Sequence, residues 1–269
     1  MNLITLTPLD LAVAAVLVVT LAATSYRLRL GVERDLIIAT ARTFIQLLLI
    51  GMVLKVLFEN TNLLWVSLMA AVMLAAAGRE VMVRQQRRFL GWWGYGLGTM
   101  SMFISSFTVT LLVLFTIIGA EPWYTPQYAI PLLGMMLGNT MNGVALGLDR
   151  LTQSAWQQRA VIESRLMLGD DSNTAIGEIA REATRIGMIP IINAMAAAGI
   201  VSLPGMMTGQ ILAGAPPLEA VKYQILIMCT ITIGTGFATI AAVRIGARHL
   251  FDERQRLRLD RLRKPAPGA

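Results

Sequence analysis

Long apolar runs alternate with short polar connections along this chain of 269 residues. A helix of about 20 apolar residues crosses the roughly 30 Å hydrocarbon core of a bilayer. Seven runs approach or exceed that length, and the shortest of them is 63–78. The predicted spans cover residues 9–26, 36–58, 63–78, 95–119, 128–148, 189–214 and 223–247.

Helices suit these runs because every backbone polar group in lipid needs an internal hydrogen bond, which a helix supplies within one segment. Bacterial membrane barrels commonly have an even number of shorter strands. We therefore predict an all-α membrane protein with seven transmembrane helices in a single domain, residues 1–269. No Lys or Arg precedes the first run, which we expect to be a retained span rather than a signal peptide.

Positive charge is concentrated in alternate connections. Twenty of the 23 Lys and Arg residues lie at 26–35, 79–94, 150–187 and from Arg244 onward. Because cytoplasmic loops retain Lys and Arg, we expect the N-terminus outside and the C-terminus inside the cytoplasmic (inner) membrane. A basic cytoplasmic tail then covers about 248–269, of which 264–269 is expected to be disordered.

The composition agrees with a membrane protein, since 55% of residues are hydrophobic and 14% are charged, against about 25% charged in soluble domains. A pI near 10.2 would suggest nucleic acid as a partner of a soluble protein. Here the basic loops and anionic membrane lipid account for it, so we expect lipid contact and no nucleic-acid binding.

The connection at 150–187 is too long for a simple turn and is predicted to form two cytoplasmic helices. Leu168 and Gly169 end the first helix as a C-terminal cap does. Asp170 and its neighbours supply capping oxygens for the second helix. That helix is amphipathic, either lying on the membrane or its own bundle, or docking a cytosolic partner. Its apolar face carries Ile176, Ile179, Ala183 and Ile186.

Nothing in the chain suggests an enzyme. Cys229 is the only cysteine and His249 the only histidine, so neither a disulfide nor a Cys/His metal cluster is expected. No G-x-x-x-x-G-K-[ST] motif occurs. We therefore expect no cofactor on this chain and ATP, if it is used, on another protein.

A break is predicted within the sixth run, where Pro204 removes an amide donor and frees the carbonyl of Ile200. Broken helices at membrane depth line protein or water, as transport pathways do, although a packing kink would have the same sequence. The candidate pathway residues here are Ser202, Pro204, Gly205, Met206 and Met207.

Asn139 and Asn142 extend the candidate pathway into the fifth run, where close helix packing explains them equally well. Thioethers are soft metal ligands, but methionine is more often an adaptable filler of hydrophobic cores. The candidate metal contacts are Met135, Met136, Met206 and Met207.

Three segments resemble the FetB-type permeases of ABC transporters, a family linked to iron export with relatives among plant aluminium-tolerance permeases. They are Val-Ser-Leu-Pro-Gly-Met-Met-Thr-Gly at 201–209, Ala-Val-Lys-Tyr-Gln at 220–224 and the stretch 130–139 with its Pro131 and Gly138. The resemblance extends over nearly the whole chain and implies a permease that pairs with a second copy of itself. It also implies a separate ATPase subunit that binds ATP and Mg²⁺.

The resemblance also implies where the ATPase docks. Glu163, Leu168 and Gly169 are similar to the Glu-x-x-x-x-x-Gly coupling loop of ABC permeases, although the next Ile-Pro lies farther downstream here. The expected coupling residues are Glu163, Leu168, Gly169, Asp170, Ile176 and Ile179.

Iron export is the function that the resemblance implies, whereas the residues alone leave the substrate open. Fe²⁺ prefers imidazole and carboxylate ligands, which these runs do not offer at depth. A lipid-like or sugar-nucleotide substrate fits the sequence equally well. An ion-coupled secondary transporter is disfavoured because no acidic residue lies at mid-span.

Overall fold

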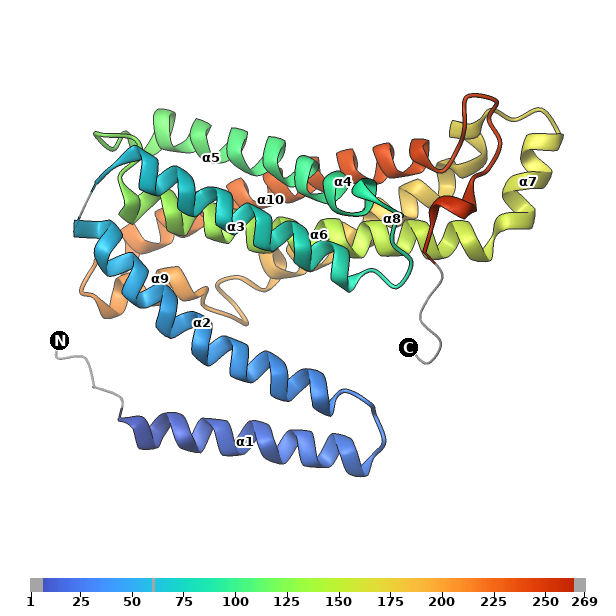
Figure 1. The fold of residues 1–269 in the computed structure, drawn as a ribbon. Helices are drawn as coiled ribbons and strands as arrows, with labels where there is room; N and C mark the ends of the chain where they lie inside the picture. Colours follow the sequence, from blue (N-terminus) through green and yellow to red (C-terminus); the bar gives the residue numbers. More distant parts are fainter. Residues whose placement is uncertain (1–6, 60, 264–269) are drawn as a thin grey trace. The chain divides into compact units, whose positions relative to one another are not determined.

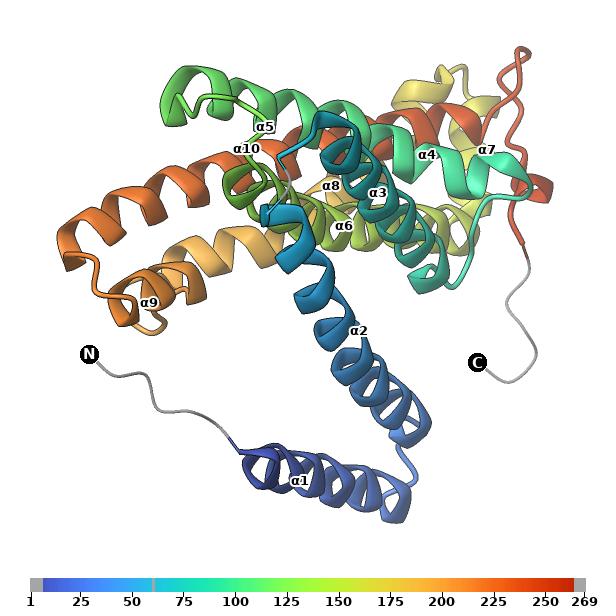
Figure 2. The same cartoon turned by 60° about the vertical axis from the view of Figure 1, so that its left-hand side comes forward.

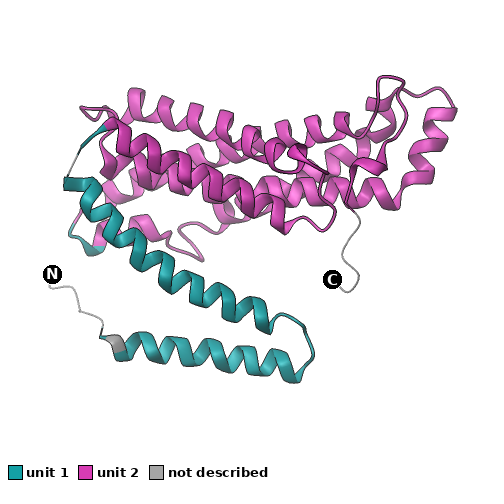
Figure 3. Ribbon diagram, viewed as in Figure 1, with its two compact units in different colours: residues 1–62, 212–214 teal, residues 63–211, 215–269 magenta. Residues whose placement is uncertain are grey.

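The computed structural model describes residues 7–59 and 61–263. The chain divides into two compact units, which Figure 3 distinguishes by colour. Unit 1 comprises residues 1–62 and 212–214, and unit 2 comprises residues 63–211 and 215–269. The prediction of a single permease domain concerns the arrangement of these units and stays a prediction.

Unit 1 is a pair of helices joined by a short turn. The Asp10 carboxylate in the first turn of the first helix accepts a hydrogen bond at 2.8 Å from the backbone N–H of Thr7, which satisfies a donor that a helix start leaves unpaired. The Ser25 hydroxyl donates to the Glu33 carboxylate at 3.3 Å and links the two helix ends. The helices are α1, Pro8–Arg27, and α2, Glu33–Glu59.

Unit 2 is a bundle of long helices with shorter helices at its ends (Figure 1, Figure 2). α4, η1, α5 and η2 follow one another without a break and form one helical rod. The elements are α3 Leu63–Arg84, α4 Trp92–Met102, η1 Phe103–Phe107, α5 Thr108–Val113, η2 Leu114–Ile118, α6 Pro126–Gln157, α7 Arg159–Met167, α8 Ser172–Ala197, α9 Gly205–Leu212, α10 Pro217–His249 and η3 Leu259–Arg261.

The elements η1 and η2 are π-helical, so their wider turns depart from the α-helical register of the rod. In η1 this geometry accompanies a contact with α10, because the Ser105 hydroxyl donates to the Gly234 carbonyl oxygen at 2.7 Å. Short π-helical stretches frequently occur at functional sites. The rod therefore has a defined irregularity where it meets α10.

Small residues bring α6, α8 and α10 into close contact. A Cβ atom added to Gly187 of α8 would lie 2.5 Å from the carbonyl oxygen of Gly143 on α6 and 2.7 Å from Cγ2 of Thr239 on α10. Only glycine at position 187 permits this approach, as at small-residue helix interfaces in membranes. The three helices run side by side in both views of the fold (Figure 1, Figure 2).

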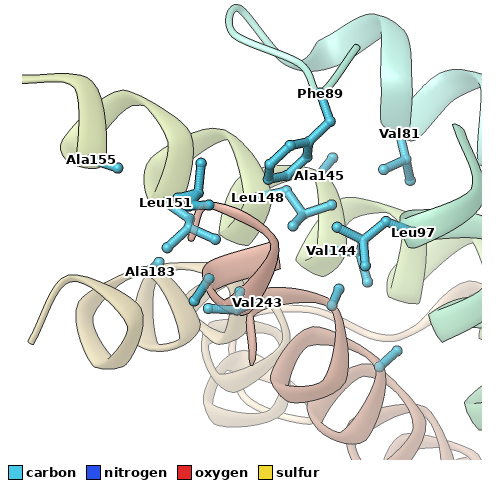
Figure 4. Packing of buried hydrophobic residues seen from close by; sticks show 14 of the residues in the cluster. Val81, Phe89, Leu97, Val144, Ala145, Leu148, Leu151, Ala155, Ala183 and Val243 are labelled. Carbon is cyan, nitrogen blue, oxygen red and sulfur yellow. The ribbon is translucent and has the colours of Figure 1, made fainter. Parts of the chain in front are cut away.

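Part of the apolar core of unit 2 lies where α6, α8 and α10 meet the connection between α3 and α4. Figure 4 shows Phe89 of that connection directed toward Leu148 and Ala145 of α6. Burial of such side chains is worth about 1.5–3 kcal/mol each in water. The labelled core residues are Val81, Phe89, Leu97, Val144, Ala145, Leu148, Leu151, Ala155, Ala183 and Val243.

The all-helical membrane fold is confirmed, because the described residues contain six helices long and apolar enough to cross a bilayer and only isolated β-bridges. The predicted sixth span is divided between the end of α8 and α9. Neither part is a helix both long and apolar enough to cross a bilayer by itself. The count of seven spans therefore stays a prediction. The six helical segments lie at Leu9–Arg27, Glu33–Glu59, Leu63–Arg84, Trp92–Ile118, Pro126–Gln157 and Pro217–His249.

The predicted basic tail folds back on unit 2 as far as the structure describes it. The backbone N–H of Leu90 donates to the Arg261 carbonyl oxygen at 2.8 Å, and that of Arg263 donates to the Arg88 carbonyl oxygen at 2.8 Å. Leu262 is buried in the core of unit 2. The expected disorder of 264–269 concerns residues outside the described part of the chain.

Candidate functional site

The two helices predicted within 150–187 are present, and α7 and the start of α8 form an elbow there. α7 ends at Met167, and Gly169 follows with φ of +100°, a conformation that side chains with a Cβ atom rarely adopt. Asp171 caps α8, accepting a hydrogen bond from the backbone N–H of Thr174 at 3.2 Å. A hydrogen bond from the Thr174 hydroxyl lowers the pKa of Asp171. The carboxylate therefore stays charged at the positive end of the helix dipole.

Ion pairs brace the elbow from within. The Arg165 guanidinium lies 3.3 Å from the Asp170 carboxylate and 3.8 Å from that of Glu178, so it joins α7 to α8. The predicted coupling residue Glu163 pairs with Arg159, one helical turn earlier, at 2.8 Å. Exposed pairs of this kind contribute little stability singly. Those of Arg165 link α7 to α8, whereas the pair of Glu163 lies within α7.

The tip of the elbow presents apolar side chains to the surroundings. Leu168 is 87% exposed and Met167 is 81% exposed. Adjacent exposed apolar side chains outside the predicted spans are available for contact with a partner protein. Of the predicted coupling residues, Leu168 is therefore the one whose side chain is free to enter a partner.

The amphipathic face of α8 packs into its own bundle, which was one of the two interpretations left open. Ile176 and Ile179 are both buried, and both belong to the core cluster of unit 2. Direct contact of these two side chains with a partner would require unpacking of that core. Their part in coupling stays a prediction, and their position allows them to act only through the packing of α8.

The predicted helix break in the sixth run is present and begins before the proline. α8 ends at Ala197, and α9 begins at Gly205, directly after Pro204. In between, Gly199 has φ of +82°, and its backbone N–H donates to the Ser202 carbonyl oxygen at 2.9 Å. The seven residues from 198 to 204 thus form a compact turn rather than a simple kink.

The predicted pathway residues of the break are on the surface of the described structure. Ser202 and Gly205 are exposed, whereas Pro204, Met206 and Met207 are half-buried. Ile200, at the tip of the turn, is 88% exposed. In a membrane protein such a surface faces lipid, water or another chain.

The two candidate asparagines have different partners. Asn142 Oδ1 accepts a hydrogen bond at 2.6 Å from the Arg84 guanidinium at the end of α3. Asn139 Nδ2 donates to the Met135 carbonyl oxygen, one turn earlier in α6, at 2.9 Å. Asn142 therefore serves as a helix-to-helix contact, and the amide oxygen of Asn139 is the more available group.

The candidate methionines do not occupy one environment. Met136 is fully buried, and its methyl carbon would lie 2.2 Å from a Cβ atom at Gly234 of α10. Met135, Met206 and Met207 are half-buried. Among the described residues no group of three or more His, Cys, Asp or Glu side chains could hold a metal ion. Metal contact by these thioethers stays a prediction.

Sequence reasoning missed several hydroxyls that are buried among the helices of unit 2. Ser106 donates to Thr140 Oγ1 at 3.4 Å, while the hydroxyl oxygens of Thr110, Thr235 and Thr239 are buried without a hydrogen-bond partner. Such unpaired groups are rare in protein interiors. Their signal in the sequence is hydroxyl residues at helical spacing within apolar runs.

Known proteins match nearly the whole chain, which confirms the resemblance seen in its motifs. A family model described as "Uncharacterised protein family (UPF0014)" matches residues 8–251. No solved structure matches the chain.

Three of the similar proteins are matched over most or all of their own length. "UPF0014 membrane protein YjkA" of Bacillus subtilis is 33% identical over 93% of this chain and 98% of its own length. "Protein ALUMINUM SENSITIVE 3" of Arabidopsis thaliana is 34% identical over 86% and 82%. "Probable iron export permease protein FetB" of Escherichia coli is 31% identical over 98% and 100%.

Proposed function

Because this chain belongs to the UPF0014 family of membrane proteins, we propose that it is the permease subunit of an ATP-driven ABC transporter. Its proposed substrate is iron or a related metal, exported across the cytoplasmic membrane. The match to the probable iron export permease FetB carries this proposal, because it covers all of that protein. The chain is then a transport subunit rather than an enzyme, and a separate chain hydrolyses ATP.

The elbow between α7 and α8 is the proposed docking site of the ATPase. Its tip exposes Met167 and Leu168, and the pairs of Arg165 with Asp170 and Glu178 hold α7 against α8. We expect a movement of this tip to be transmitted to α8 through these contacts. Because α8 ends at the turn before Pro204, it connects the ATPase to the break in the sixth run.

The break and a second copy of the chain are proposed to form the translocation pathway. The turn at 198–204 exposes large apolar side chains, including Ile200. Two permease copies with two ATPase copies would alternate between inward-open and outward-open states. Asn139, Ser202 and the half-buried Met206 and Met207 are the proposed pathway groups.

The proposal is tested with the full-length chain purified from membranes together with the proteins that accompany it. ATP hydrolysis is measured with and without Fe²⁺, for the natural chain and for Leu168→Asp. We expect hydrolysis that Fe²⁺ stimulates, and we expect less of it to accompany Leu168→Asp because the ATPase docks less tightly on that variant. Hydrolysis indifferent to Fe²⁺ would overturn the metal assignment in favour of a lipid-like or sugar-nucleotide substrate. Transport that survives ATP depletion but stops when the proton gradient is dissipated would instead indicate a secondary transporter.

A further inference from the structure

An apolar groove of about 900 Å³ opens on unit 2 between the rod and α10. This volume is in the range of pockets that hold organic ligands. The rod contributes one wall, α10 the other, and Leu74 of α3 lies at one side. Large groove residues include Trp92, Trp93, Phe103, Val109, Phe237 and Ile245.

The groove is long enough for an acyl chain. Its wall on the rod extends from Trp92 to Val109, which at about 1.5 Å per residue corresponds to roughly 25 Å of helix. One leaflet of a bilayer has a hydrocarbon depth of about 15 Å, half of the 30 Å core. A lipid tail lying along the rod is therefore in contact with the groove over its whole length.

The face of α10 that lines the groove leads toward two arginines near the end of that helix. The α10 wall is formed by Phe237, Ala241 and Ile245. Successive residues of an α-helix are about 100° apart around its axis. Viewed along α10, Arg248 therefore falls within the sector that these three residues span, and Arg244 lies about 20° outside it. Both arginines are exposed. In the described part of the chain, neither has a carboxylate partner.

The same end carries the aromatic residues that mark a membrane interface. The Trp93 ring stacks on the His249 ring, with centroids 4.0 Å apart and an angle of 16° between the planes. This contact places the tryptophan end of the groove beside the last turn of α10, next to Arg248. Trp92, also in the groove, is 81% exposed. Tryptophans concentrate where lipid headgroups meet the hydrocarbon.

We propose that this groove is a binding site for an anionic phospholipid. One acyl chain lies along Phe103 and Phe237, and the headgroup phosphate is held by Arg248 and Arg244. Basic pockets between membrane helices bind anionic headgroups in this way. A zwitterionic lipid would place its own positive group near the two arginines and bind less tightly. The site makes membrane composition a determinant of how the rod packs on α10.

A second copy of this chain is a poorer occupant of the same face. A two-fold interface brings the same surface patch of each subunit together. In that arrangement Arg244 and Arg248 of one copy would face the same surface of the other copy. The groove residues of that surface include no Asp or Glu that could pair with them. The like charges would repel each other in a medium of low dielectric constant, whereas a phosphate neutralises them.

The test uses lipid quenching of tryptophan fluorescence in the full-length chain. Trp65, Trp123 and Trp156 are replaced by Phe, which leaves the two groove tryptophans as reporters. The protein is reconstituted in phosphatidylcholine vesicles with increasing fractions of phosphatidylglycerol or phosphatidylcholine brominated on the acyl chain. Since each arginine near an anionic headgroup is worth about 1 kcal/mol, we expect about a fivefold preference for phosphatidylglycerol per arginine.

Three variants make the test specific. Arg244→Gln with Arg248→Gln should remove the preference, whereas Arg254→Gln with Arg263→Gln, which removes the same charge outside the groove stripe, should keep it. Ala241→Phe should reduce quenching by both lipids because it fills the groove. Equal quenching by the two lipids, or a preference that Arg244→Gln with Arg248→Gln leaves intact, would overturn the proposal.

A separate arm detects the competing occupant. Cys229 is the only cysteine, so Cys229→Ser with Ile245→Cys places a single thiol in the groove. With a lipid in place, Ile245→Cys should form little disulfide between copies in the vesicles. Efficient crosslinking that excludes brominated lipid would show that a second copy covers this face and would overturn the lipid assignment.

Discussion

Gly143 and Gly187 bring the backbones of α6 and α8 into direct contact, since a Cβ atom on Gly187 would lie 2.5 Å from the Gly143 carbonyl oxygen. The atom it would meet belongs to backbone and has little room to move. α6 carries the candidate Asn139, and α8 connects the elbow to the helix break. The geometry of this pair therefore sets how the proposed docking site is connected to the proposed pathway.

Gly187→Ala should therefore destabilise the protein by about 1–3 kcal/mol, the usual range for overpacking a close-packed site. Gly138→Ala, in the same helical bundle, is the matched control because a Cβ atom there meets nothing within 4 Å. Thermal unfolding in detergent, followed by loss of monodisperse protein, measures the difference. Equal midpoints for Gly187→Ala and Gly138→Ala would contradict the close contact.

Leu168→Asp should weaken binding of the ATPase without unfolding the permease. The side chain is 87% exposed, so its replacement removes no internal contact, whereas loss of an interface anchor commonly costs 1–3 kcal/mol or about tenfold or more in affinity. Leu90→Asp serves as the control, since Leu90 is also exposed but lies outside the elbow. The measurement is ATPase retained per permease after purification. If Leu90→Asp lost as much ATPase as Leu168→Asp, docking at the elbow would be rejected.

Met206→Leu with Met207→Leu should reduce the metal resistance that the transporter confers on cells. Leucine keeps the volume and apolar character but lacks the thioether ligand. Met102→Leu, in the buried core, controls for the loss of a methionine as such. Growth over a range of iron concentrations, at matched protein levels, provides the measurement. Unchanged resistance in the double variant would show that these thioethers do not contact the metal.

Acid should loosen the segment that follows α10. Backbone N–H groups of Arg256 and Arg254 donate to the Asp252 carboxylate at 2.9 Å and 3.0 Å. The hydrogen bond from the Arg256 backbone is the main cause that lowers the pKa of Asp252 below its ordinary value of 3.8. The stabilisation is therefore complete above pH 3.8 and is lost as the pH falls through the lower pKa of the folded state.

Hydrogen exchange of residues 251–262 measures this effect, with rates expected to rise below pH 3.8 after correction for intrinsic exchange. Asp252→Asn removes the charge at every pH and should raise the exchange rate already at neutral pH. Glu253→Gln, one residue later, removes the same charge and should behave as the natural chain does. Protection of the segment in Asp252→Asn at neutral pH would show that the carboxylate does not hold it.

The sequence predicted six of the long apolar helices well because hydropathy is a property of short stretches of chain. The long run at 95–119 and the helix Trp92–Ile118 agree closely. The break near Pro204 was also predictable, because a missing amide donor is a local property. Its start at residue 198 was not, since it depends on Gly199 adopting a left-handed conformation.

Long-range packing was beyond the sequence pattern. The apolar face of α8 could have met lipid, a partner or its own bundle, and only tertiary structure shows Ile176 and Ile179 inside the core. The fold of the basic tail likewise depends on backbone hydrogen bonds between Leu90 and Arg261. Charge composition gives no sign of such a pairing, because backbone groups are common to all residues.

Gln255 has a consequence for how the elbow can move. Its side-chain oxygen accepts a hydrogen bond at 2.8 Å from the backbone N–H of Ser172, the first residue of α8. The same segment is hydrogen-bonded through Arg261 and Arg263 to the connection between α3 and α4. A pull on α8 must break the contact at Gln255 or carry that connection along. As long as the Gln255 contact holds, the start of α8, the segment 251–263 and the connection before α4 would thus move together.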